Sequence, residues 1–131
     1  METLKPTFTQ AIKGGLISGV VAAPLNLTWN LIAPSLGSVP PPNFMIAVAV
    51  SSILPLLIGA ILYFLLVKYS KNGRMIFLVV SAVFTIVSLY GTIQPTMPDG
   101  TAAPQGFALL TIPMHLIAGA VAMWGIPKFS N

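Results

Sequence analysis

Charged side chains are scarce in this sequence, and acidic ones are almost absent. Charged residues make up 6% of the 131 residues, and the acids are Glu2 and Asp99. The surface of a soluble domain usually needs about 25% charged residues. Because 56% of the chain is hydrophobic, the composition excludes a water-soluble fold and indicates an integral membrane protein.

Cysteine is absent from the sequence, which excludes disulfides, thiolate metal sites and thiol redox chemistry. The single histidine, His115, has no second His, no Cys and no intramembrane carboxylate with which to share a metal ion, so we expect no metal site. A GxxxxGK phosphate-binding motif is also missing. The sequence therefore points to no cofactor.

The positions of the acids also bear on catalysis. General acid–base chemistry needs titratable groups placed together, yet Glu2 lies in the N-terminal tail and Asp99 lies in a loop. His115 lies deep in an apolar run, so neither acid completes a Ser-His-acid set with it. We expect that the protein is not an enzyme.

What the chain has in abundance is apolar sequence, arranged in four long runs. They cover residues 11–34, 44–67, 75–93 and 107–126. Each run is about 20 residues long and would give roughly 30 Å of helix, enough to cross a bilayer core. Prolines inside the runs are tolerated in membrane helices when neighbouring groups satisfy the freed carbonyls. The predicted fold is one all-α domain, residues 1–131, a polytopic four-transmembrane-helix bundle.

Basic residues lie on one side of this predicted topology. All six Lys and Arg fall in the N-terminal segment, the turn Lys68–Arg74 or the C-terminus, and the Pro-rich loops 35–42 and 96–106 carry none. The positive-inside rule then predicts cytoplasmic termini, N-in and C-in. We expect the membrane to be the plasma (inner) membrane of a bacterium. Because the cations lie at the ends of apolar runs without interleaved aromatics, we expect no nucleic-acid partner.

Small and polar side chains form a stripe along one face of every predicted helix. These stripes are Gly15, Gly19, Ala22, Asn26 and Asn30; Ser52, Gly59 and Tyr63; Ser81, Thr85, Ser88 and Thr92; and Thr111, His115, Ala118, Ala122 and Gly125. Membrane helices associate through close contacts of small residues and through interhelical hydrogen bonds. The GxxxG match at Gly15 and Gly19 would serve packing within the chain or a dimer contact.

Asn26, Ser52, Ser88 and His115 lie at a similar depth, at the centre of their runs or slightly toward the outer side, and Asn30 and Thr92 lie above them, nearer the outer end. We predict a small polar site in the outer half of the bundle that opens to the outer face, with Asn30 and Thr92 near its mouth. Its candidate residues are His115, Asn26, Asn30, Ser52, Ser88 and Thr92. His115 would act there as a proton carrier or as a hydrogen-bond donor to a ligand. In the alternative interpretation, these groups pair only with each other or with carbonyls freed at the prolines.

Two short segments, Leu25–Asn30 and Pro113–Ala120, carry a resemblance to small four-span bacterial integral membrane proteins of an uncharacterised family. That resemblance implies four helices and no activity. In size the chain is also similar to small multidrug-resistance transporters, which rely on a carboxylate in their first helix, where this chain has Asn26 and Asn30. It superficially resembles the small four-helix fluoride channels, but six cations on one side argue against their dual topology.

Two functions remain compatible with the sequence. The first is a non-enzymatic binding or accessory role, in which the polar site takes a small or lipophilic molecule or the lipid-facing surface docks a membrane protein. The alternative is an oligomeric channel or small-solute transporter subunit, because four short helices enclose little volume. The expected partners are thus the lipid bilayer, a lipophilic molecule or membrane protein, and further copies of the chain in a homo-oligomer.

The predicted orientation is tested by cysteine labelling, because the chain has no cysteine of its own. A membrane-impermeant thiol reagent added to intact cells should label Asp99→Cys, whereas a cysteine in the turn Lys68–Arg74 should react only after the cells are opened. Labelling of residue 99 from the cytoplasmic side would overturn the topology and the depth argument.

Overall fold

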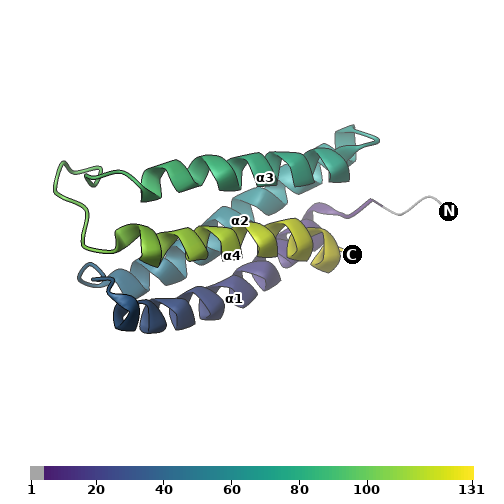
Figure 1. The fold of residues 1–131 in the computed structure, drawn as a ribbon. Helices are drawn as coiled ribbons and strands as arrows, with labels where there is room; N and C mark the ends of the chain where they lie inside the picture. Colours follow the sequence, from purple (N-terminus) through teal and green to yellow (C-terminus); the bar gives the residue numbers. More distant parts are fainter. Residues whose placement is uncertain (1–4) are drawn as a thin grey trace.

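The computed structural model describes residues 5–131, so Glu2 and the start of the predicted polar tail lie outside the described residues. Within this range the chain forms four α-helices: α1 Phe8–Ile32, α2 Phe44–Tyr69, α3 Gly73–Thr92 and α4 Phe107–Phe129. A short 3-10 helix, η1 Ala33–Leu36, follows α1. All four α-helices are long and apolar enough to cross a membrane. The predicted all-α fold with four membrane-spanning helices is confirmed (Figure 1).

The helices extend beyond the predicted spans for local reasons. α1 begins at Phe8 because Thr7 and Gln10 form a capping box, in which each side chain accepts a hydrogen bond from the other residue's backbone N–H. α2 and α4 continue past residues 67 and 126 and include Lys68 and Lys128 in their last turns. A cation there is favoured by the exposed carbonyls at a helix C-terminus.

α1 packs closely against α2 and α4 because glycine lets the backbones approach. A Cβ added at Gly15 would lie 2.6 Å from the Ala60 Cβ and 2.9 Å from the Leu56 carbonyl oxygen, both in α2. One added at Gly14 would lie 2.9 Å from the Ile126 carbonyl oxygen in α4. The GxxxG motif therefore makes a helix contact within the chain. Near the other end of α1, the Trp29 indole N–H donates to the Leu110 carbonyl of α4 over 3.0 Å.

α3 lies on the opposite side of the bundle from α1 (Figure 1) and contacts α2 and α4 but not α1. Its buried residues are Gly73, Phe77 and Thr92. Near the α2–α3 turn, the Phe77 ring packs edge-on against Tyr63 with 5.1 Å between ring centroids. Further along, Thr85 lies against Gly119 of α4. α3 thus touches the bundle at a few places along its length and has fewer buried residues than α1, α2 or α4.

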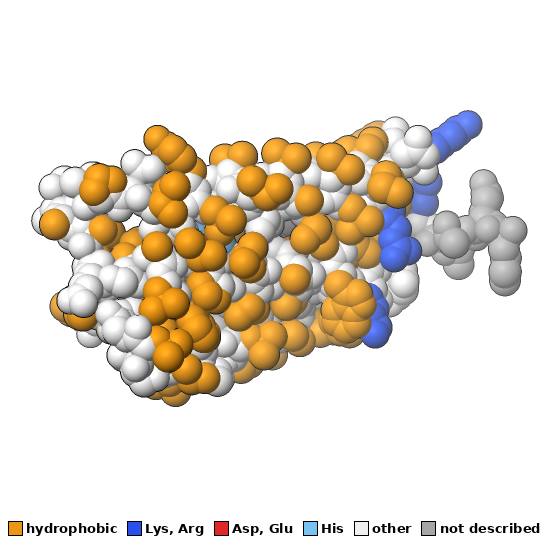
Figure 2. Space-filling model, viewed as in Figure 1, with side chains coloured by type: hydrophobic (Ala, Val, Ile, Leu, Met, Phe, Trp, Pro, Cys, Tyr) orange, Lys and Arg blue, Asp and Glu red, His pale blue; other side chains and the backbone are white. Residues whose placement is uncertain are grey.

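The two loops opposite the termini are joined to each other. The Val39 N–H donates to the Gln105 carbonyl over 2.8 Å. Gly106 has a φ of 68°, and a Cβ added to it would lie 2.7 Å from the Ser38 Cα, so glycine suits this position for both backbone conformation and contact. Lys and Arg side chains gather at the other end of the molecule, where the termini and the α2–α3 turn lie (Figure 2).

Gly15→Ala should reduce the stability of the bundle by about 1–3 kcal/mol, because the new methyl group would overpack the contact with Ala60. Gly91→Ala is the matched control: a Cβ there meets nothing within 4 Å, so no loss is expected. Thermal unfolding followed by circular dichroism in detergent measures both changes. Equal stability of the two variants would contradict the close α1–α2 contact.

Candidate functional site

A groove with a volume of about 770 Å³ lies between α2, α3 and α4. This is within the range of about 300–1,000 Å³ that is usual for small-molecule pockets. α4 forms its floor with Met114, His115, Ala118 and Gly119, and α1 contributes Asn26. Most of the remaining lining is apolar and comes from α2 and α3.

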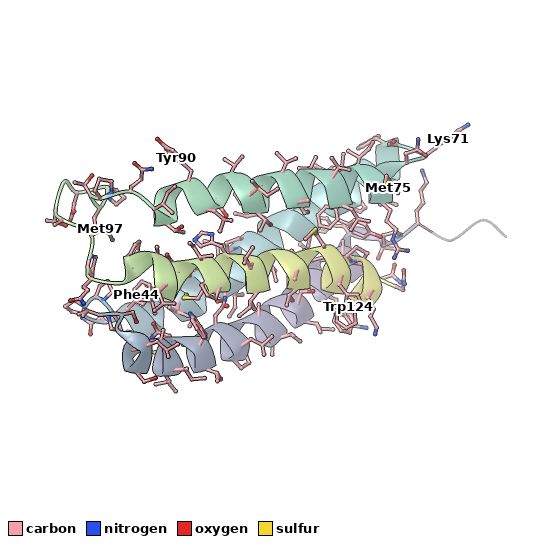
Figure 3. The ribbon with its side chains drawn as sticks, in the orientation of Figure 1. Phe44, Lys71, Met75, Tyr90, Met97 and Trp124 are labelled. Carbon is pink, nitrogen blue, oxygen red and sulfur yellow. The ribbon has the colours of Figure 1, made fainter. Side chains whose placement is uncertain are left out.

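The groove opens sideways between α2 and α3. Side chains on both of its edges are largely exposed: Ile58 of α2 is 60% exposed and Phe84 of α3 is 68% exposed. In a bilayer these edges face hydrocarbon. At the end near the α2–α3 turn, the groove stops at Phe77, which is buried against Tyr63. At the loop end it reaches Phe44 at the start of α2 (Figure 3), whose ring lies 6.4 Å from that of Phe107.

One interhelical hydrogen bond joins α1 to α2 beside the groove. The Asn26 Nδ2 donates to the Ser52 Oγ over 2.9 Å, and the Ser52 hydroxyl donates to the Val48 carbonyl over 2.7 Å. A hydroxyl has a single proton, so the Ser52 oxygen can only accept from Asn26. This assigns the orientation of the amide. The Asn26 Oδ1 is left buried, without a hydrogen-bond partner among the described residues.

A second interhelical hydrogen bond joins α3 to α4. The His115 Nδ1 lies 2.9 Å from the Ser88 Oγ, and the Ser88 hydroxyl donates to the Thr85 carbonyl over 2.7 Å. By the same reasoning the proton between His115 and Ser88 belongs to the imidazole Nδ1. In the neutral ring, Nε2 is then a hydrogen-bond acceptor. His115 is half-buried and lines the groove.

The six predicted site residues do not all reach the groove. Asn26, Ser88 and His115 line it, and Ser52 lies behind Asn26 and is bonded to it. Asn30 is buried elsewhere, with its Nδ2 donating to the Met45 sulfur over 2.6 Å.

Thr92 is also buried away from the groove and donates to the Leu89 carbonyl of its own helix. The two interhelical pairs are of the kind that the alternative interpretation describes, since these polar groups do bond to each other. Three of the paired residues nevertheless also line a groove.

Sequence reasoning missed the mouth of the groove. Ser51, Ile58 and Phe84 lie on faces that resemble ordinary lipid-facing surface. One signal was available in the sequence: the stripe Ser81–Thr92 of α3 carries hydroxyls but no glycine on the same face, whereas the stripe of α1 begins with Gly15 and Gly19. A helix without glycine at its contacts cannot approach its neighbours as closely.

The one acidic side chain among the described residues lies away from the groove. Asp99 is exposed in the α3–α4 loop, where the Thr101 hydroxyl donates to its carboxylate over 2.6 Å and the Thr101 N–H over 3.0 Å. These bonds to the charged form hold the pKa of the Asp99 carboxyl below its usual value. Within residues 5–131, no group of three His, Cys, Asp or Glu residues could hold a metal ion.

Comparison with known proteins gives one match. Residues 6–130 match the family model described as "Family of unknown function (DUF6069)". No curated protein and no solved structure matches the chain.

Ser52→Ala should lower the stability of the bundle by about 1 kcal/mol, because it removes the acceptor of the buried Asn26 amide. The neighbouring Ser51→Ala is the matched control. Both serines donate to the Val48 carbonyl, but Ser51 is exposed and bonds to no other helix, so its replacement should cost less than about 0.5 kcal/mol. Chemical unfolding in detergent gives both values, and equal losses would argue against the α1–α2 hydrogen bond.

Proposed function

The chain belongs to the DUF6069 family, whose function is unknown, and from its geometry we propose that it is a non-enzymatic membrane protein that binds a lipophilic molecule between α2, α3 and α4. The observation that carries this proposal is the lateral groove. It combines a volume of about 770 Å³ with an apolar lining and a few polar atoms. Ligand sites typically have this composition, in which apolar walls provide affinity and a few polar groups orient the ligand.

The position of the mouth supports a ligand that partitions into the bilayer. Exposed apolar side chains of α2 and α3 border it, so a molecule dissolved in hydrocarbon enters without crossing a polar surface. A water-soluble ligand would have to pass Phe44 and Phe107 at the loop end of the groove. Apolar entry is therefore the less costly route.

We place the termini in the cytoplasm and the two loops outside, in the plasma membrane of a bacterium. The gathering of Lys and Arg at the end with the termini supports this orientation (Figure 2). Asn26, Ser88 and His115 each lie closer to the loop end of their helices than to the other end. In this orientation the polar part of the groove lies in the outer half of the bilayer.

The lining also supports a binding role over catalysis. His115 is the one side chain among the described groove residues that titrates near neutral pH. General acid–base chemistry at a bound molecule would need a second titratable group beside it. A groove that holds and orients a molecule needs none.

An oligomeric channel or small-solute transporter subunit is the second candidate. Ser81, Thr85 and Ser88 place hydroxyls along the groove on successive turns of α3. If a second copy covered the mouth, this row would form one polar wall of a path. In the single chain the groove ends at Phe77, so this function requires assembly.

Filling the groove mouth should displace the bound molecule. Ala47 of α2 is exposed and lines the groove, whereas Ala120 of α4 is exposed and does not. In native mass spectrometry of detergent-purified protein, wild type and Ala120→Trp should retain one co-purifying lipophilic molecule. Ala47→Trp should lose it, because the indole occupies its space.

The same spectra decide between the candidates. Equal retention by Ala47→Trp and Ala120→Trp would place the bound molecule outside the groove and contradict the binding proposal. An empty, symmetric higher oligomer would favour the channel or transporter subunit.

A further inference from the structure

The polar atoms of the groove that can be assigned are hydrogen-bond acceptors. The clearest is the Asn26 Oδ1. Asn26 is 3% exposed, lines the groove, and has its amide nitrogen committed to Ser52. Its carbonyl oxygen has no partner among the described residues. Because buried polar atoms in proteins are nearly always hydrogen-bonded, an unpartnered acceptor on a lining residue favours a ligand that brings its own donor. The oxygen itself has almost no accessible surface, so a donor in the groove meets it when the Asn26 side chain turns toward the groove.

His115 adds a second acceptor on the floor. Its Nδ1 proton points to Ser88, whose own proton is used at the Thr85 carbonyl. Nε2 of the neutral ring makes no hydrogen bond with the described part of the chain and can only accept. Asn26 from α1 and His115 from α4, which both line the groove, thus each carry an acceptor without a partner among the described residues.

The hydroxyls along the groove follow the same pattern. Thr85 donates to the Ser81 carbonyl and Thr111 donates to the Phe107 carbonyl, each over 2.8 Å. Ser51 donates to the Val48 carbonyl over 3.2 Å. Each of these oxygens keeps only lone pairs for a ligand.

The backbone adds to this excess of acceptors. Pro55 has no N–H, so the carbonyl of Ser51 lacks its usual helical donor. Ser81 is the exception among the lining hydroxyls, since its own hydroxyl makes no hydrogen bond to the described residues and remains able to donate. Among the polar atoms of the lining residues, hydrogen-bond acceptors therefore outnumber free donors.

We propose that the groove selects a lipid-like alcohol, an apolar chain with a neutral hydroxyl that donates to the Asn26 Oδ1; this inference rests on the binding function proposed above. A ketone, an ether or a hydrocarbon offers no proton to that oxygen. An ammonium group would donate, but no carboxylate lines the groove among the described residues to balance its charge, and burying an unpaired cation in hydrocarbon is costly. A neutral O–H satisfies the acceptor without that cost.

Asn30 provides a matched control within the same helix. It is also buried, also uses its Nδ2 in a hydrogen bond, and also has an unpartnered Oδ1 among the described residues. It lies one turn closer to the end of α1, however, and does not line the groove. If an unpartnered buried oxygen were enough to bind an alcohol, Asn30 would matter as much as Asn26.

The test uses oleyl alcohol, oleyl methyl ether and the corresponding hydrocarbon, titrated into delipidated protein and quantified by native mass spectrometry. Wild type should bind the alcohol about tenfold more tightly than the ether, the difference expected for one hydrogen bond. The ether and the hydrocarbon should bind alike, since neither donates. Asn26→Leu should remove the preference for the alcohol, and Asn30→Leu should keep it.

Folding of the variants is checked by circular dichroism. Asn26→Leu leaves the Ser52 hydroxyl bonded to Val48, so it creates no unpaired buried donor. Should it nevertheless fail to fold, Ala47→Trp decides the question: a preference that comes from the groove is lost when the mouth is filled, and a preference that survives overturns the inference.

The two proposals fail in different ways. Equal binding of all three probes, blocked by Ala47→Trp, would keep the binding groove and overturn the selection for a donor. No binding of any probe in the groove would overturn the proposed function itself. A preference that is unchanged in Asn26→Leu and lost in Asn30→Leu would contradict the assignment to the Asn26 Oδ1.

Discussion

Close contact of α1 with α2 and α4 is the constraint on which the other features of this protein depend. Lipid is as apolar as leucine, so burying leucine cannot hold membrane helices together, and backbone proximity must do so. Gly14, Gly15 and Gly19 allow that proximity. Once the three helices are drawn together, Asn26 is forced into a place where water cannot reach it, and its hydrogen bonds must come from a neighbouring helix or a bound molecule.

α3 lacks the close backbone contact that joins α1 to α2 and α4, and the groove forms beside it for that reason. It has no contact with α1, and its hydroxyl-bearing face packs against a glycine of α4 at one place, where Thr85 meets Gly119. Three tightly packed helices and a fourth loosely attached one leave a lateral space. The polar side chains that would otherwise meet at the bundle centre border this space.

Much of the fold could be predicted from one sequence because length, apolarity and one-sided charge act on each helix separately. Asn26 and His115 were identifiable for the same reason, since each interrupts an apolar run. Asn30 and Thr92 were assigned to the same site by depth, but depth does not determine which way a helix is rotated. Asn30 bonds to a methionine sulfur, a partner that no polarity pattern indicates. Phe84 borders the groove because of where α3 lies in the bundle, on α2 and α4 and without contact to α1, and the pattern of one helix does not reveal that placement.

The hydrogen bond between Val39 and Gln105, together with the contact of Gly106 on Ser38, has a mechanical consequence. It anchors the first turn of α4 to the α1–α2 loop, so the start of α4 cannot follow α3 outward. At the other end of α3, Gly73 is fixed against Leu66. The segment that links the two ends is itself folded, because the Ala103 N–H donates to the Pro95 carbonyl over 2.9 Å and the Met97 N–H donates to the Thr101 carbonyl over 2.7 Å. α3 is therefore fixed at both of its ends, and its distance from the other three helices sets the width of the groove.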